Sequence, residues 1–259
     1  MMNEEQSTAK RPRSASRYRT GYACLFAAIV ALAGQSALPQ SSAVENEGLR
    51  YEISRWMQID DNPSLVLDVF TVECWLNAES RVVVVSRDKP GNLEPDWSVV
   101  FDAPRERIEF MTGMGGNPDE YFHTAAGSFR AARWNHLSVS VNGPAGLLRI
   151  YINGIQELAA SFPRRNFTVS CGLAWGGYWN NALGATGNAI IDEAKYWNTE
   201  RTSTQITNGM NRAQPLDDRT GLHGYWRFCS NFADSSGFGN HGRSESTRLN
   251  SSHVALSRM

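Results

Sequence analysis

The chain has 259 residues, of which 41 % are hydrophobic and 20 % are charged. It can therefore bury a substantial core, and its composition excludes a disordered or fibrous protein. The formal net charge of −1 hides an asymmetry, because residues 1–44 carry five basic and two acidic side chains, whereas residues 45–242 carry 17 basic and 23 acidic ones. An acidic domain without a stripe of Lys or Arg is a poor polyanion binder, which argues against nucleic acid as a partner.

The N-terminal segment has the pattern of a secretory signal peptide. Five basic residues precede an apolar run, Gly21 to Gly34, and small residues after it allow cleavage near Ala37 or Ala43. The run is shorter than the roughly 20 apolar residues of a membrane span, and an uncleaved signal anchor is the alternative. We expect residues 1–44 to be a signal peptide with a basic leader. The mature domain is then secreted, extracellular or periplasmic, with no membrane span and in an oxidising compartment.

Between this leader and residue 242, the sequence shows the period-two alternation of β-strands. Apolar and polar residues alternate from Val69 to Asn77, as in a half-buried strand, and again in Asn135 to Val141 and Leu147 to Ile152. Asn153-Gly154 follows as a hairpin signal, because both residues tolerate positive φ. Further strands are predicted at 51–59, 82–85, 97–102, 107–112, 168–175, 190–197 and 222–228.

One short helix interrupts this pattern near the C-terminal end. Thr202 and Gln205 have the spacing of a capping box, and Ile206 and Met210 share one helical face, which predicts about two turns. Many short antiparallel strands in one domain otherwise indicate an all-β fold. We predict a two-sheet antiparallel jelly-roll sandwich over residues 45–242.

Four blocks of the sequence resemble laminin G-like, concanavalin A-like jelly-roll modules. The first, Ser54 to Leu76, combines a P-S-L loop with an F-T-V-E-C-W strand. The others are Trp134 to Ile155, Ile191 to Ile206 and Met210 to Gly242, in the family's order. The resemblance implies two antiparallel sheets, a shallow concave side that faces the ligand, and often a bound calcium ion. It implies no single function, because the superfamily includes lectins, adhesion modules, pentraxins and glucanases.

The C-terminal part departs from the family pattern. Cys229, Ser230 and Asn231 replace the usual acidic pair and glycine, and Ser246 to Met259 resembles the translation of a sequencing-library adapter. We therefore expect the genuine sequence to stop near Gly242, leaving an exposed sheet edge, with residues 243–259 as an unstructured tail. A disordered polar tail is the alternative. Outside the leader, Cys74, Cys171 and Cys229 are an odd number, which predicts one disulfide and one buried thiol without choosing the pair, and Asn166-Phe-Thr168 is a glycosylation sequon.

Aromatic rings beside amides are the best candidates for a sugar-binding site. A ring can stack on a pyranose while amides bond its hydroxyl groups, and the segment after Trp175 offers both. The alternative is packing, which we expect of Trp175 itself. The candidates are Tyr178, Trp179, Asn180 and Asn181 in this segment and Tyr121 and His123 in another loop, whereas Trp56, Trp75, Trp134, Trp197 and Trp226 lie on predicted strands and are expected in the core or between the sheets.

Calcium is the most plausible cofactor. The loop from Asp234 to Asn240 offers a carboxylate, an amide oxygen and carbonyl groups at glycines such as Gly237, which are the hard oxygen ligands that Ca²⁺ prefers. By resemblance, Asp192 would lie nearby as a second carboxylate. The alternative is that Asp234 and Asn240 only stabilise an Asx-type turn and Asp192 accepts a backbone hydrogen bond.

Nothing in the sequence indicates catalysis. A retaining glycosidase needs two carboxyl groups roughly 5–5.5 Å apart on one face, but no Glu-x-Asp-x-Glu string occurs. Asp192 and Glu193 are adjacent on a predicted strand and should point to opposite faces. No G-x-S-x-G motif supports nucleophilic catalysis. We therefore expect a secreted or surface module that binds carbohydrate or an extracellular protein. A structural or adhesive module without a ligand, within a longer protein, is the first alternative, and a glucanase-like enzyme the second.

Overall fold

The computed structural model describes residues 49–51, 55–88, 95–112, 120–167, 171–178, 187–211, 219–228 and 231–246. The chain divides into two units, Met1–Asn46 and Glu47–Met259, and every described residue belongs to the second. The predicted signal peptide therefore lies outside the described residues. In the described part of the chain, no helix is long and apolar enough to cross a membrane.

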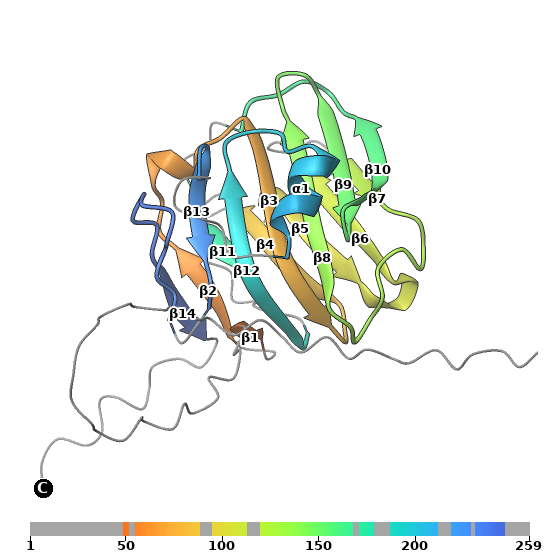
Figure 1. Ribbon diagram of the computed structural model, residues 1–259, viewed down its shortest axis with the longest axis horizontal. Coiled ribbons are helices and arrows are strands. Elements are labelled where there is room, and N and C mark those ends of the chain that lie inside the picture. The colour runs from red at the N-terminus through yellow and green to blue at the C-terminus, as the bar shows by residue number, and fades with distance from the viewer. Residues whose placement is uncertain are drawn as a thin grey trace, which may run out of the picture. The chain divides into compact units, whose positions relative to one another are not determined.

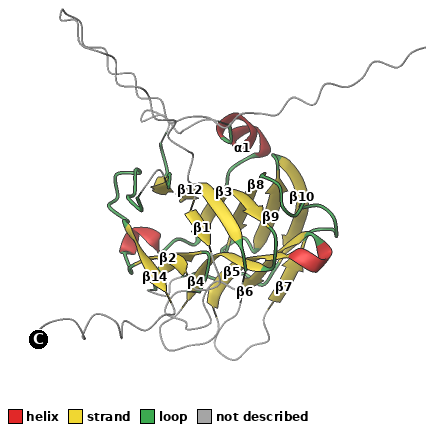
Figure 2. Ribbon diagram, turned by 90° about the horizontal axis from the view of Figure 1, so that it is seen from below, coloured by secondary structure: helices red, strands yellow, loops and turns green. Residues whose placement is uncertain are grey.

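The described residues form two antiparallel sheets packed face to face, which confirms the predicted sandwich (Figures 1 and 2). Sheet A has the order β1 (Leu49–Tyr51), β12 (Ala189–Trp197), β3 (Val69–Ala78), β8 (Asn135–Asn142), β9 (Leu147–Ile152) and β10 (Ile155–Ser161), and β13 (Leu222–Trp226) also pairs with β12. Sheet B has the order β14 (Gly242–Ser246), β2 (Arg55–Ile59), β11 (Leu173–Trp175), β4 (Val82–Asp88), β5 (Pro95–Asp102), β6 (Arg107–Thr112) and β7 (Glu120–His123). Two short 3₁₀ turns, Pro63–Leu65 and Ala103–Arg105, and one helix, α1 (Ser203–Gly209), complete the described elements.

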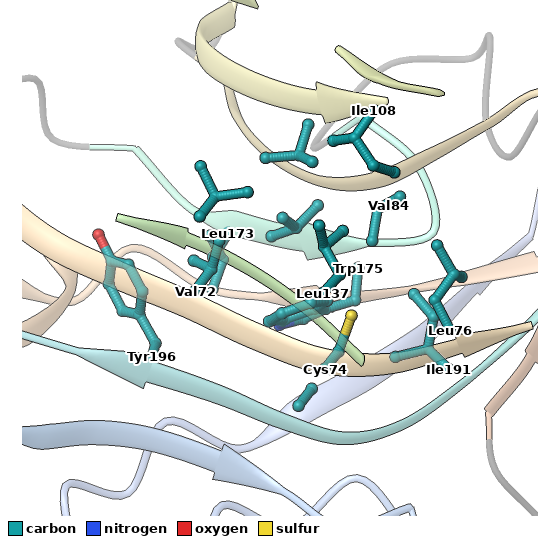
Figure 3. Close-up of a cluster of buried hydrophobic side chains, with 14 of the residues drawn as sticks. Val72, Cys74, Leu76, Val84, Ile108, Leu137, Leu173, Trp175, Ile191 and Tyr196 are labelled. Carbon is teal, nitrogen blue, oxygen red and sulfur yellow. The ribbon is translucent and has the colours of Figure 1, made fainter. Parts of the chain in front are cut away.

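The core lies between the sheets and is built from the alternating residues that the sequence marks. Figure 3 shows Val72, Cys74 and Leu76 of β3 pointing toward side chains of the facing sheet. Aromatic rings fill the widest part, where Phe70 stacks on Trp97 with ring centroids 4.8 Å apart. Each buried aromatic removes a large apolar area from water, so these contacts hold the two sheets together.

Most of the predicted strands are confirmed, but the strand predicted at 51–59 is wrong as one element, because β1 ends at Tyr51 and pairs in sheet A, whereas β2 begins at Arg55 and pairs in sheet B. Asn153 and Gly154 both adopt positive φ, 53° and 81°, and connect β9 to β10 as the hairpin signal predicts. Gly154 is required for a second reason, since a Cβ there would lie 2.5 Å from Oγ1 of Thr207 in α1. Strands β7 and β10 were not predicted separately, and residues 168–170 of one predicted strand lie outside the described residues.

A bulge in β12 changes the predicted direction of one side chain. Asp192 pairs with Trp75 and Lys195 with Glu73, so two residues of β12 oppose one residue of β3. Glu193 takes φ of 51° within this bulge, and its carboxylate accepts a hydrogen bond from the Tyr225 hydroxyl group on the outer side of sheet A. The expectation that Asp192 and Glu193 point to opposite faces is therefore wrong, because the bulge breaks the period of two.

Residues 198–211, which we call the strap, cross the outer face of sheet A and include α1 (Figure 2). The capping box is confirmed, with Thr202 and Gln205 bonded reciprocally. The strap is held by Arg201, whose Nε lies 2.7 Å from Oε1 of Glu73, a carboxylate that is only 1 % exposed. The Arg201 guanidinium also lies 3.8 Å from the centre of the Trp197 ring. At the far end of the strap, Trp75 donates its indole N–H to the Met210 carbonyl oxygen at 2.7 Å.

His136 is buried beside this ion pair, with Nε2 3.6 Å from Oε2 of Glu73. Burial, together with the positive charges of Lys195 and Arg201, lowers the pKa of His136 to about 3. The imidazole is therefore neutral at physiological pH, and its contact with Glu73 is not an ion pair. Burial raises the pKa of Glu73, against which Arg201 and Lys195 act.

The C-terminal end of the described chain differs from the expectation. Residues from 243 onward were predicted to be unstructured, but Gly242–Ser246 form β14 against β2, and Arg243 forms an ion pair with Asp60. The unpaired backbone groups of a strand edge can accept an extended segment of almost any composition, which explains how this polar stretch joins the sheet. Residues 247–259 lie outside the described residues, and the adapter origin stays a prediction.

Cysteine and tryptophan positions only partly follow the expectations. Cys74 is a free thiol in the core, and Cys171 is also buried. Cys229 lies outside the described residues, so the predicted disulfide stays a prediction. Trp134 was expected in the core but is 45 % exposed, because β8 begins only at the following residue. Trp56, Trp175 and Trp226 are buried in the core as predicted. Trp75 is half-buried under the strap, and Trp197 is buried under Arg201 in a separate cluster with Leu222 and Tyr225 rather than between the sheets.

We expect Arg201→Ala to lower the free energy of unfolding by about 3 kcal/mol, because it leaves the buried Glu73 carboxylate without its closest cation. Adding Glu73→Gln should recover part of the loss. The control is Arg130→Ala, which removes an exposed ion pair with Glu106 at 3.7 Å and should cost less than about 1 kcal/mol. Guanidinium denaturation of the wild type, Arg201→Ala, Arg201→Ala with Glu73→Gln, and Arg130→Ala measures these free energies of unfolding. Equal losses of unfolding free energy in Arg201→Ala and Arg130→Ala would contradict the proposed role of the buried pair.

A pH dependence follows from the buried His136. The folded domain keeps this group neutral down to about pH 3, whereas the unfolded chain takes up a proton below the ordinary value of 6.5. Acidification from pH 6.5 toward pH 3 should therefore cost stability, by at most about 1.4 kcal/mol per pH unit from this group. His136→Gln should make the decline of unfolding free energy in this window less steep. Parallel curves for the two proteins would show that His136 does not titrate this way.

Candidate ligand-binding site

Two of the predicted ligand residues lie on the outer face of sheet B, on the edge strand β7. Phe122 packs against the core, so its neighbours Tyr121 and His123 face outward by the alternation of the strand. Tyr121 is 53 % exposed. His123 is exposed as well, and its Nδ1 lies 3.1 Å from the Thr124 carbonyl oxygen.

A third predicted residue, Tyr178, comes to the same face from a distant part of the sequence. The segment after β11 turns back over sheet B, where Ser86 donates its hydroxyl group to the Gly177 carbonyl oxygen at 2.9 Å. This turn packs Tyr178 on a small apolar cluster made of Val83, Val100 and Met111. Tyr178 is thus half-buried rather than a free loop side chain. Trp179, Asn180 and Asn181 lie outside the described residues.

Met111 connects the two tyrosines. It lies directly opposite Tyr121 in the β6–β7 register, and it is also part of the cluster under Tyr178. Directly opposed residues of antiparallel strands share one face, so the three side chains line one stretch of surface. We call Tyr121, Tyr178 and Met111 the tyrosine surface.

Charged side chains border the tyrosine surface along β6. Glu109 lies opposite His123 and holds two arginines, with Oε1 2.6 Å from Nη2 of Arg107 and Oε2 3.2 Å from Nη1 of Arg81. Arg107 also reaches Asp102, with Nε 3.1 Å from Oδ2. Sequence reasoning missed these residues, although alternation in the predicted strand 107–112 already placed Arg107, Glu109 and Met111 on one face.

The carboxyl groups of this face are suited to hydrogen bonding rather than to acid catalysis. Burial acts to raise the pKa of Asp102, but Arg105 and Arg107 together lower it below its ordinary value. A catalytic acid needs the opposite shift. Among the described residues, raised pKa values of about 6 belong to Asp96, which is buried beside Arg87, and to Asp192 in the β12 bulge of the other sheet. Burial is the main cause of both shifts.

The predicted calcium loop is closed by its own hydrogen bonds. Oδ1 of Asp234 accepts from the backbone N–H groups of Tyr225 and Ser236, and Oδ2 accepts from the Ser236 hydroxyl group and the Asn240 N–H group, all within 2.7–2.9 Å. The Asn240 carbonyl oxygen accepts the indole N–H of Trp226 at 2.8 Å. Gly237 takes φ of 102° at the exposed end of the loop.

These residues do not fit a calcium ion, which takes about six to eight oxygen ligands. Both oxygens of the Asp234 carboxylate already accept two hydrogen bonds each, and Asp192 makes no hydrogen bond to this loop in the described structure. Within the described ranges, no group of three or more His, Cys, Asp or Glu side chains could hold a metal ion. The geometry supports the Asx-type turn, which is the alternative that the sequence leaves open, and the melting experiment below tests calcium binding.

Comparisons with known proteins agree with the fold. Residues 52–207 match the Laminin_G_3 family model of the concanavalin A-like lectin/glucanases superfamily. A Bacteroides ovatus protein to which carbohydrate binding has been ascribed is similar with a TM-score of 0.53 at 15 % identity, over 75 % of this chain and 58 % of that one. A heptameric SAP-like pentraxin from Limulus polyphemus is similar with a TM-score of 0.50 at 11 % identity, over 67 % and 87 %. No curated protein sequence matches the chain.

We expect Asp234→Ala to lower the melting temperature by the same amount in calcium and in a chelator. The variant loses four hydrogen bonds to a buried charged group, which should cost about 2 kcal/mol or more, or roughly 4–8 °C for a domain of this size. Asn231→Ala is the control, because it removes a single exposed hydrogen bond to the Ala233 N–H group. A calcium-dependent rise in wild-type melting temperature that Asp234→Ala abolishes would instead establish the calcium site.

Proposed function

Because the chain belongs to the concanavalin A-like lectin/glucanases superfamily, we propose that it is a carbohydrate-binding module whose glycan lies against the tyrosine surface of sheet B. The observation that carries the proposal is the exposure of Tyr121, a flat ring held on a strand and bordered by the charged groups of β6. The carbohydrate binding ascribed to the Bacteroides ovatus protein of the same fold supports the choice of ligand class.

The geometry of the face suits a sugar ring. A pyranose presents axial C–H groups on one side, which can pack on the Tyr121 ring, and hydroxyl groups around its edge. In the adjacent row, the exposed His123 lies opposite the buried Glu109, and the partly buried Arg107 lies one row further, opposite Asp102. His123 and Arg107 can form hydrogen bonds with those hydroxyl groups. Asp102 and Glu109 already hold the Arg107 guanidinium in place, so little side-chain entropy is lost when a ligand binds.

The outer face of sheet B is a better candidate for glycan binding than the outer face of sheet A. The strap covers much of the outer face of sheet A, and the inner faces of both sheets are packed in the core. Sheet B carries no such strap among its described residues, apart from the short turn that ends at Tyr178. On this face Tyr121 and His123 of the edge strand β7 are exposed, whereas Val83, Val100 and Glu109 in the middle of the face are buried.

A binding role is favoured over catalysis, which is the second candidate because the superfamily includes glucanases. On the outer face of sheet B, the described carboxylates Asp102 and Glu109 are both ion-paired with Arg107, and the pKa of Asp102 is lowered despite partial burial. Neither is placed as a proton donor for a glycosidic oxygen. Hydrolysis of laminarin or hydroxyethylcellulose by the protein would overturn this part of the proposal.

The lectin-type fold also fits an extracellular location. The N-terminal sequence up to residue 44 has the pattern of a signal peptide. Because this segment lies outside the described residues, secretion stays a prediction. The alternative of a structural or adhesive module without a ligand predicts no binding to any glycan, and a glycan array separates the two.

We expect Tyr121→Ala to weaken binding to the best ligand of a glycan array at least tenfold, about 1.4 kcal/mol, because a stacked ring loses its whole contact area. Tyr121→Phe keeps the ring and should retain most of the affinity. Trp134→Ala is the matched control, since it removes an aromatic ring of similar exposure that precedes β8 in the other sheet. All three should keep the wild-type melting temperature.

Equal binding by wild type and Tyr121→Ala, with the fold intact, would place the glycan elsewhere. Tyr178→Ala is a second variant of the tyrosine surface. It should weaken binding but also lower the melting temperature, because Tyr178 packs on Val83, Val100 and Met111. The free-loop interpretation of Tyr178 predicts instead no change in melting temperature.

A further inference from the structure

A second exposed aromatic ring lies at the opposite end of the sandwich. Phe238 is 48 % exposed and occupies the tip of the loop between Asp234 and Asn240. This loop precedes β14, whereas Tyr121 lies on β7, and Figures 1 and 2 show β14 and β7 at opposite sides of the domain. With strands spaced about 4.8 Å apart, the seven strands of sheet B separate these sides by roughly 29 Å.

The loop presents Phe238 in a defined position. Gly237 and Gly239, on either side of the ring, take φ of 102° and 73°, a region that residues with side chains rarely adopt. The four hydrogen bonds to the Asp234 carboxylate close the base of the loop. The Phe238 N–H group also donates to the Ser236 hydroxyl oxygen at 3.2 Å. A ring that is already positioned loses little conformational entropy when a ligand packs on it.

His223 supports the ring from below. The Phe238 and His223 rings are stacked, with centroids 4.2 Å apart and an interplanar angle of 23°. Nδ1 of His223 lies 2.7 Å from the Ser64 carbonyl oxygen, which can only accept, so Nδ1 carries the proton. In the neutral imidazole, Nε2 is then a hydrogen-bond acceptor beside the aromatic ring. One face of Phe238 rests on His223, and the ring keeps its other side toward solvent.

From these contacts, we infer that Phe238 and His223 form a second glycan subsite, which we call the Phe238 platform, where a sugar ring stacks on Phe238 and a hydroxyl group donates to Nε2 of His223. The ligand class is the same as in the proposed function, but the platform does not depend on the tyrosine surface. Each can bind sugar when the other is removed.

A sugar fits this position better than a protein does. A stable protein interface buries about 800 Å² on each partner, whereas a whole Phe side chain can bury only about 150–250 Å². The other large hydrophobic side chains that are exposed in the described residues, Tyr121, Trp134 and Ile155, lie on or beside β7, β8 and β10 rather than around this loop. A single flat ring with a neighbouring hydrogen-bond acceptor matches the size and chemistry of one pyranose.

The test uses ¹H–¹⁵N NMR spectra of the full chain, titrated with five hexasaccharides: those of cellulose, laminarin, xylan, mannan and chitin. We expect at least one of them to shift the amide signals of Ser236, Phe238 and Asn240 in the wild type. The same sugar should shift these signals in Tyr121→Ala. Phe238→Ala should weaken this response at least tenfold, and Phe238→Tyr should keep it.

Phe238→Leu separates stacking from general apolar contact, because it keeps an apolar side chain without a flat face. It should lose the response as Phe238→Ala does, and both variants should keep the wild-type melting temperature because the ring is exposed. The inference is wrong if none of the five sugars shifts the three signals in the wild type. It is also wrong if Phe238→Ala or Phe238→Leu binds as well as the wild type does, or if Tyr121→Ala abolishes the loop response. If glycan binding at the tyrosine surface is lost in the Tyr121 variants while the loop response remains, the result concerns the proposed function and does not contradict the Phe238 platform.

Discussion

The burial of aromatic side chains between the two sheets is the interaction on which the rest of the structure depends. Phe70 and Trp97 stack across the core, and Trp175 and Trp226 lie with ring centroids 6.1 Å apart at another part of it. These residues face inward because strands alternate, so every strand must give one face to the core. Only the outer faces of the sheets, their edges and the loops are then available to bind a ligand.

The two outer faces are used differently. On sheet A, the strap is fastened by the ion pair of Glu73 with Arg201, which is one of the few charged contacts buried on this face. A buried pair contributes little net stability over an apolar contact, but losing one partner is costly, so the pair acts mainly to specify where the strap lies. On sheet B, the Glu109 carboxylate is buried and held by Arg107 and Arg81. The exposed side chains of that face, Tyr121 and His123, lie on the edge strand β7.

Strained or irregular backbone occurs at the positions that shape the surfaces. The bulge at Glu193 turns its carboxylate toward Tyr225, and positive φ at Gly237 and Gly239 projects Phe238 from its loop. Both departures are supported by surrounding hydrogen bonds, those of the Asp234 carboxylate in the second case. The hydrogen bonds of the Asp234 carboxylate fix the base of the loop, and the exposed Phe238 ring is therefore held in one position. A binding site needs side chains that are positioned in this way before the ligand arrives.

Local sequence was enough for most of the elements and for the family, because alternation, the Asn153-Gly154 turn and the capping box at Thr202 depend only on neighbouring residues. It also named Tyr121 and His123, whose strand was not predicted. The tertiary structure alone decided that Tyr178 packs beside Met111 and that the β12 bulge brings Asp192 and Glu193 to one side. Each of these depends on contacts between residues far apart in the chain or on a broken period, and a pattern of neighbours contains neither.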